Sequence, residues 1–112
     1  MDRSQSLNVP PFFDGNNYAF WKVWMRALLC SIDDTIWDAV KTGWTRPKAA
    51  KSTWDKAAIA AANANSKALN AIFSGVSLDE FHRISHITVA KEAWEILETT
   101  YEGMKKVKDT KL

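Results

Sequence analysis

Apolar residues recur at helical spacing along most of this chain, and only 3 Pro and 4 Gly are present to interrupt them. The pattern is clearest between Tyr18 and Ile32, where the apolar positions are Trp21, Trp24, Met25, Leu28, Leu29 and Ile32. Spacings of three and four residues place these side chains on one face of an amphipathic helix. A chain of 112 residues with so few helix breakers has the size of one domain and is not a many-stranded β-protein. We therefore predict an all-α fold, a compact bundle of about five helices, three longer and two short.

Turn and cap residues set the expected boundaries. Pro10-Pro11 prevents a helix from starting before Phe12, so residues 1–13 are expected to form an extended N-terminal arm. Residues 14–17 form a turn that supplies N-cap candidates for the first helix. Further helices are expected from Asp33 or Asp34 to Val40, over 54–73 with Ser52 or Thr53 as cap, through 81–84, and over 89–102.

Two later signals complete the predicted organisation. Ser77 and Glu80 have the spacing of a capping box, and Gly103 stands where a helix C-cap is expected. The chain then divides into the arm over residues 1–13, a helical domain over 14–103, and the truncated start of a following helix over 104–112.

A single cysteine, Cys30, excludes an internal disulfide framework and a Cys-rich zinc module. It is typical of a reducing compartment, and we expect a cytoplasmic protein, with a nuclear location also compatible. No apolar run approaches the roughly 18 residues of a membrane span, and residues 1–6 have no apolar signal-peptide core. No membrane partner is therefore expected.

No catalytic pattern is present. His82 and His86 are four residues apart but lack further metal ligands, and neither HExxH nor CxxC occurs. The adjacent pair Asp33-Asp34 is better suited to opening a helix than to acid–base catalysis, because neighbouring side chains point apart. We expect no enzyme activity, cofactor, metal site or small-molecule substrate.

The formal net charge of +2 comes entirely from the C-terminal end. Residues 1–101 carry 11 Lys or Arg against 11 Asp or Glu, which argues against a broad basic face for nucleic acid. Candidate RNA contacts are confined to four lysines, Lys105, Lys106, Lys108 and Lys111. Such contacts would give weak, salt-sensitive binding without sequence preference. The alternative is a solvated helix face.

The 6 Trp divide into two groups. Trp21, Trp24, Trp37 and Trp94 fall on apolar helix faces and are expected in the core. Trp44 and Trp54 flank the polar connection over 44–51 and are expected to be partly exposed. They are candidate interface residues, because a partly exposed tryptophan is a typical interface anchor.

Four motifs follow one another along residues 9–112: one over 13–29, one over 37–43, one over 67–72 and one over 90–108. The residues that define them are Phe13, Asp14, Gly15, Asn17, Tyr18, Trp21, Met25, Leu29, Trp37, Leu69, Ile72, Ala90, Lys91, Glu92, Trp94, Leu97, Tyr101 and Gly103. In this order they resemble the N-terminal part of the capsid region of the Gag polypeptide of plant copia-type LTR retrotransposons. The chain departs from that pattern at Val89, where the family usually has Thr or Ser, and at Asn65, where an acidic residue is common.

The resemblance implies a non-enzymatic, capsid N-terminal-domain-like helical fold. The implied partners are further copies of the same chain, assembled into particles that package the element's RNA. The family's second helical half and its Cys/His zinc knuckle are not within these 112 residues, so the knuckle's RNA binding does not transfer. Two alternatives stay open: a Gag-derived domain used by a host protein as a protein-interaction module, and a weak RNA binder acting through the basic C-terminal tail.

Overall fold

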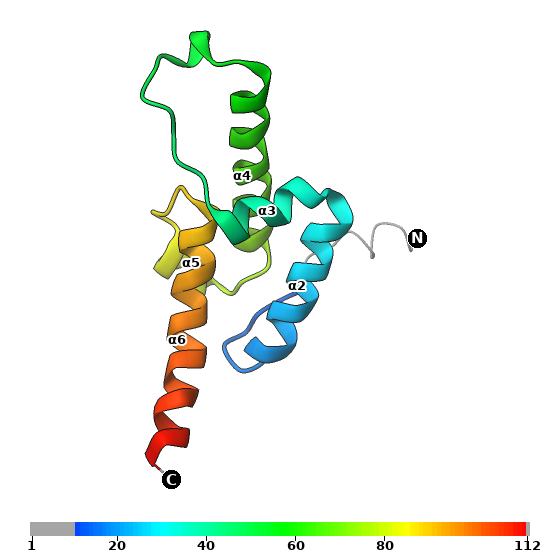
Figure 1. The fold of residues 1–112 in the computed structure, drawn as a ribbon. Coiled ribbons are helices and arrows are strands. Elements are labelled where there is room, and N and C mark those ends of the chain that lie inside the picture. The colour runs from blue at the N-terminus through cyan, green and yellow to red at the C-terminus, as the bar shows by residue number, and fades with distance from the viewer. Residues whose placement is uncertain (1–10, 112) are drawn as a thin grey trace.

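The computed structural model describes the backbone of residues 11–111 and the side chains of residues 11–102 (Figure 1). Within this part the chain forms five α-helices and one short 3₁₀ turn. They are α2 (Tyr18–Ile32), α3 (Asp34–Thr42), η1 (Lys51–Thr53), α4 (Lys56–Ser74), α5 (Leu78–Ile84) and α6 (Ala90–Lys111). The predicted all-α class, with three longer and two short helices, is confirmed. The described residues form no β-strand, and an isolated parallel β-bridge joins Phe13 to Val76.

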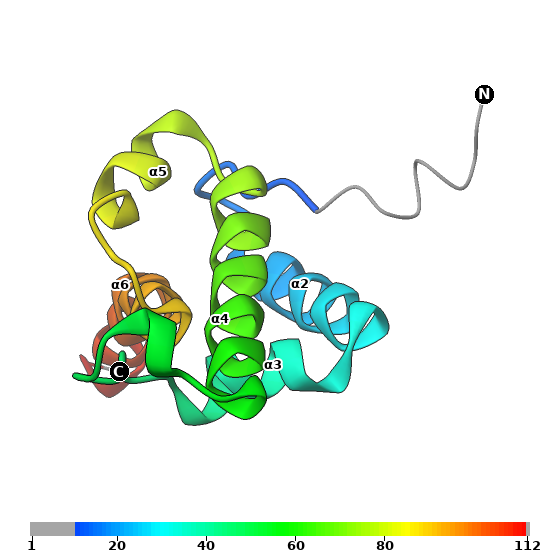
Figure 2. The same cartoon turned by 90° about the horizontal axis from the view of Figure 1, so that it is seen from above.

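Helix α4 occupies the middle of the fold. Figure 2 shows it between α2 and α6, with α3 lying across one end, and α4 packs against all three of these helices. Small side chains permit this close packing, because Ala64 and Ala68 are buried in the interface. The first turns of α4 project beyond the body together with the 43–55 connection (Figure 1).

The end of the N-terminal arm is part of the core. Phe13 is fully buried, and its backbone bonds to both sides of the α4–α5 junction. Its N–H donates to the Gly75 carbonyl at 2.7 Å, and its carbonyl accepts from the Ser77 N–H at 3.0 Å. The expected arm is therefore anchored at its last residue. Residues 1–10 lie outside the described part of the chain.

Aspartates start two of the helices. Asp33 caps α3, its carboxylate accepting from the Thr35 N–H at 2.8 Å, and this hydrogen bond holds the Asp33 pKa below its usual value. Asp55 caps α4 by accepting from the Ala58 N–H at 2.8 Å. The predicted start of α4 near Trp54, with a Ser52 or Thr53 cap, is therefore wrong. Residues 51–53 instead form the 3₁₀ turn, and the next strong capping residue takes the role.

The predicted end of the last helix at Gly103 is also wrong. Helix α6 continues through this residue to Lys111, so residues 104–111 belong to the same helix and are not the start of another. A single glycine inside a helix costs about 1 kcal/mol relative to alanine. The neighbours Glu102, Met104, Lys105 and Lys106 are good helix formers, and no proline follows to stop the helix.

No helix of the described part is both long enough and apolar enough to cross a lipid bilayer.

Candidate interaction surface

The first motif forms the turn that leads into α2. The Asn17 side chain links both sides of this turn, accepting from the Asp14 N–H at 3.2 Å and donating to the Phe12 carbonyl at 2.9 Å. The Asp14 carboxylate accepts from the Asn16 N–H at 2.9 Å. Gly15 has a φ of +101°, a conformation that strongly favours glycine. These polar motif residues therefore have a local structural role.

Four aromatic residues from the first and last motifs meet in one cluster. The Phe13 ring lies 4.9 Å from Tyr101 and 5.6 Å from Trp21, and Tyr18 stacks on Tyr101 at 5.6 Å between ring centroids. The Trp21 indole N–H lies 3.1 Å from the carbonyls of both Pro11 and Gly75. The beginning of the domain is thereby joined to α6 and to the end of α4.

Trp94 of the fourth motif stacks on Trp21 of the first motif and meets Trp37 of the second motif edge-on. Trp94 lies 5.6 Å from Trp21 and 5.4 Å from Trp37 between ring centroids. Trp37 is partly buried and also carries the Arg26 guanidinium 5.4 Å from its ring. The remaining apolar motif residues are fully buried in the same core, apart from the partly buried Leu69: Met25, Leu29, Ile72, Ala90 and Leu97.

Gly43 and Lys91 pack closely at the end of α3. Gly43 has a φ of +90°, and a Cβ added there would lie 3.0 Å from the Lys91 Cδ. The Lys91 ammonium lies 3.5 Å from the Glu95 carboxylate. Lys91 thus packs its aliphatic stem against the backbone, while Glu92 is exposed.

Glu80 is buried and does not complete a capping box. Ser77 makes no side-chain cap hydrogen bond. Instead, Glu80 accepts a hydrogen bond from the Tyr101 hydroxyl and pairs with Arg83 at 3.2 Å. Burial, followed by the hydrogen bond to Glu80, raises the pKa of Tyr101 to about 12. The capping-box prediction is wrong, because a tertiary partner outcompetes the local backbone.

The two candidate interface tryptophans are both partly buried. Trp54 closes its own loop: its indole N–H donates to the Ala49 carbonyl at 3.0 Å, and the Arg46 guanidinium lies 5.1 Å from its ring. Trp44 lines a groove of about 400 Å³ between α3 and the first turns of α4, floored by Ala57, Ala60, Ala61 and Ala64. The two residues therefore belong to different local environments.

A group of neighbouring exposed apolar side chains lies elsewhere, on the outer side of α2. Phe20, Val23 and Trp24 are 58%, 65% and 52% exposed, and the rings of Phe20 and Trp24 are 5.1 Å apart. The prediction that Trp24 lies in the core is wrong, and Ile32, on the predicted apolar face of this helix, is also 54% exposed. Helix α2 has two apolar faces, and Trp24 belongs to the second one, with Phe20, Val23 and Ala27. These four positions also have helical spacing in the sequence, so the sequence pattern itself indicates a second apolar face.

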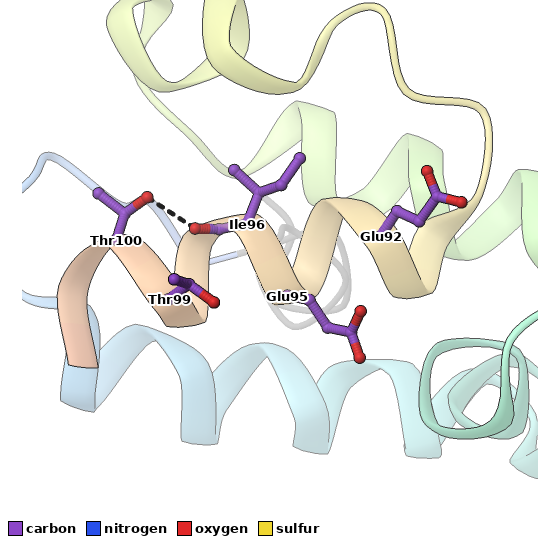
Figure 3. Close-up of a pocket in the computed structure, with 5 residues that line it drawn as sticks. All are labelled: Glu92, Glu95, Ile96, Thr99 and Thr100. Atoms are coloured by element: carbon purple, nitrogen blue, oxygen red, sulfur yellow. Dashed lines mark hydrogen bonds between the residues drawn. The ribbon is translucent and has the colours of Figure 1, made fainter. Parts of the chain in front are cut away.

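A depression on the outer side of α6 offers no plausible catalytic arrangement. Its lining residues are Glu92, Glu95, Ile96, Thr99 and Thr100, all from one helix. Figure 3 shows the two carboxylates directed to different sides, and the Thr100 hydroxyl donates to the Ile96 carbonyl at 2.7 Å. Across the residues that the structure describes, no group of three or more His, Cys, Asp or Glu is placed to hold a metal ion.

The four candidate RNA-contacting lysines lie on the last turns of α6. Their side chains are outside the described part of the structure.

Comparisons with known proteins find no relative of this chain. No protein-family model, curated protein sequence or solved structure is significantly similar to the chain.

Proposed function

We propose that this protein is a capsid-like Gag domain of a copia-type retrotransposon, whose work in the cytoplasm is to associate with further copies of itself. The observation that carries this proposal is the apolar outer face of α2. Three of its large side chains, Phe20, Val23 and Trp24, are more than half exposed. Contiguous exposed apolar surface on a small protein is typical of an interaction site.

The packing of the motif residues supports the same proposal. Segments far apart in the sequence meet in one aromatic core, from Phe13 through Trp21 and Trp94 to Tyr101. Most of the residues on which the resemblance rests therefore stabilise the core of this domain. We propose accordingly a non-enzymatic protein without a cofactor, which acts through its surface and packages RNA as part of a larger particle.

Assembly of the Gag polypeptide that contains this domain tests the proposal. We expect particles by negative-stain electron microscopy, and RNA inside them that is protected from added nuclease. A polypeptide that stays monomeric at high concentration and forms no particles would contradict it. A Lys→Gln variant at positions 105, 106, 108 and 111 separates assembly from RNA binding. If particles still form but contain no RNA, the basic tail contributes RNA binding.

The exposed α2 face also suits a second candidate, a Gag-derived domain adopted by a host protein as a protein-interaction module. The reading frame after Leu112 distinguishes the two. Protease and reverse-transcriptase sequence favours the retrotransposon, whereas an unrelated host domain favours the adopted module.

A further inference from the structure

The outer face of α2 is a continuous apolar stripe, defined by Phe20, Val23, Trp24 and Ala27. These positions follow one another at spacings of three, one and three residues, so they lie along one side of the helix. All four residues are exposed. On a helix of 15 residues, the stripe runs from the third residue to the tenth, a length of about 10 Å.

The charges of α2 are already engaged within the molecule. Lys22 pairs with Glu102 on α6, and the Arg26 guanidinium lies over the Trp37 ring. The helix contains no acidic residue. An identical partner brings identical charges, and like charges placed opposite one another would oppose association. The stripe itself is uncharged, so a second copy meets no such repulsion at its centre.

The order of side-chain sizes along the stripe is self-complementary. If two α2 helices pack antiparallel about a two-fold axis between Val23 and Trp24, Phe20 of each copy lies opposite Ala27 of the other. Val23 of each copy then lies opposite Trp24 of the other. Each large ring faces a smaller side chain, which is what close packing across a two-fold axis requires.

We infer that the α2 stripe is a two-fold contact between copies of this chain, with the two α2 helices antiparallel. This inference rests on the proposed function and specifies one of its contacts. The exposed parts of Phe20, Val23 and Trp24 amount to roughly 400 Å² per copy, about half of the 800 Å² that each partner gives to a standard stable interface. The contact is therefore weak by itself, and in an assembly it is strengthened by additional contacts.

Sedimentation equilibrium of the purified chain, from roughly 10 µM to 1 mM, tests the contact. We expect reversible dimerisation that Val23→Arg weakens by at least about tenfold, since each dimer then holds two unpaired charges at its centre. Leu78→Arg is the matched control, because Leu78 is 69% exposed on α5, away from the stripe. It is expected to change the dimer dissociation constant less than about twofold. Circular dichroism and thermal melting of both variants verify that the fold is intact.

A mixture of two variants tests the antiparallel orientation. Val23→Lys in one chain and Trp24→Glu in the other place an ammonium opposite a carboxylate across the two-fold axis. We expect the mixture to dimerise more strongly than either variant alone. Equal association of the mixture and the separate variants would overturn the antiparallel pairing.

Three results would overturn the contact itself: a chain that stays monomeric up to 1 mM, a Val23→Arg chain that dimerises like the parent, or a Leu78→Arg chain weakened to the same extent. Particle formation by the longer Gag polypeptide is a separate measurement. Particles that form normally with Val23→Arg would remove the α2 contact from the assembly and leave the proposed function standing.

Discussion

The side chain of Asn65 on α4 joins the start of α6, its amide oxygen accepting a hydrogen bond from the Ala90 N–H at 2.8 Å. The amide nitrogen donates to the Thr88 carbonyl, also at 2.8 Å. Asn65 is 3% exposed and Ala90 is fully buried. One buried amide thus satisfies an N–H in the first turn of α6 and a carbonyl of the preceding loop, a role usually filled by a local cap residue.

Replacement of Asn65 by alanine is expected to lower the free energy of unfolding by about 2–3 kcal/mol, because it leaves a buried N–H and a carbonyl without partners. Urea denaturation followed by circular dichroism measures the change. Asn63→Ala, at an exposed position on the same helix, is the control and should stay within about 0.5 kcal/mol of the parent. Equal effects at the two positions would show that the Asn65 hydrogen bonds contribute little.

The two described glycines with positive φ should respond differently to alanine. At Gly15 no atom lies within 4 Å of an added Cβ, so Gly15→Ala carries backbone strain alone, about 1 kcal/mol. At Gly43 the strain is joined by the contact with Lys91, and we expect Gly43→Ala to cost about 2–3 kcal/mol.

Thermal denaturation of a double variant separates the two contributions to the cost of Gly43→Ala, which are the backbone strain and the contact with Lys91. Lys91→Ala removes the crowding side chain but not the backbone strain. In that background, Gly43→Ala should cost less than it does in the parent, because only the backbone strain remains. If the cost at Gly43 is unchanged, the Lys91 contact does not contribute.

The sequence predicts the helices well and the side-chain environments less well, for physical reasons that particular residues illustrate. The local periodicity of α2 is strong enough to define Tyr18–Ile32 as a helix. The same periodicity does not say which of its two apolar faces points inward, so the sequence pattern wrongly places Trp24 in the core. Asn65 and Glu80 find partners 25 and 21 residues away, and such distant pairings leave no mark in local spacing.

Alkaline pH is expected to destabilise the protein through its two tyrosines. The folded pKa of Tyr101, about 12, lies above the ordinary value of 10.0, and burial raises the pKa of Tyr18 in the same direction. The neutral hydroxyls are thus favoured in the folded state. Their contribution is complete below about pH 10 and is lost as the pH rises towards 12. The melting temperature, measured from pH 8 to pH 11.5, should fall steeply above pH 10.

Phenylalanine substitutions distinguish the two tyrosines. Tyr101→Phe removes the hydrogen bond to Glu80 and should cost about 1–2 kcal/mol at pH 7. Tyr18→Phe should instead be neutral or stabilising by up to about 1 kcal/mol, because the Tyr18 hydroxyl is buried and has no hydrogen-bond partner among the described residues. Each variant should flatten the alkaline fall in part. If the melting temperature of both variants depends on pH as it does in the parent, the two tyrosines are not the cause of the alkaline destabilisation.

Trp21 joins the N-terminal arm to the end of α4, and its replacement tests how firmly the arm is held. Trp21→Phe removes the indole N–H that lies near the carbonyls of Pro11 and Gly75, and it opens space beneath the buried ring. We expect the free energy of unfolding to fall by about 2–4 kcal/mol, as measured by chemical denaturation.

Trp24→Phe is the matched control, because the Trp24 side chain is 52% exposed, and it should change the free energy of unfolding by less than about 0.5 kcal/mol. Hydrogen exchange gives an independent reading: the Phe13 N–H, bonded to Gly75, should exchange faster in Trp21→Phe and at the parent rate in Trp24→Phe. Equal protection of Phe13 in both variants would mean that the backbone bridge to Val76 holds the arm without help from the indole.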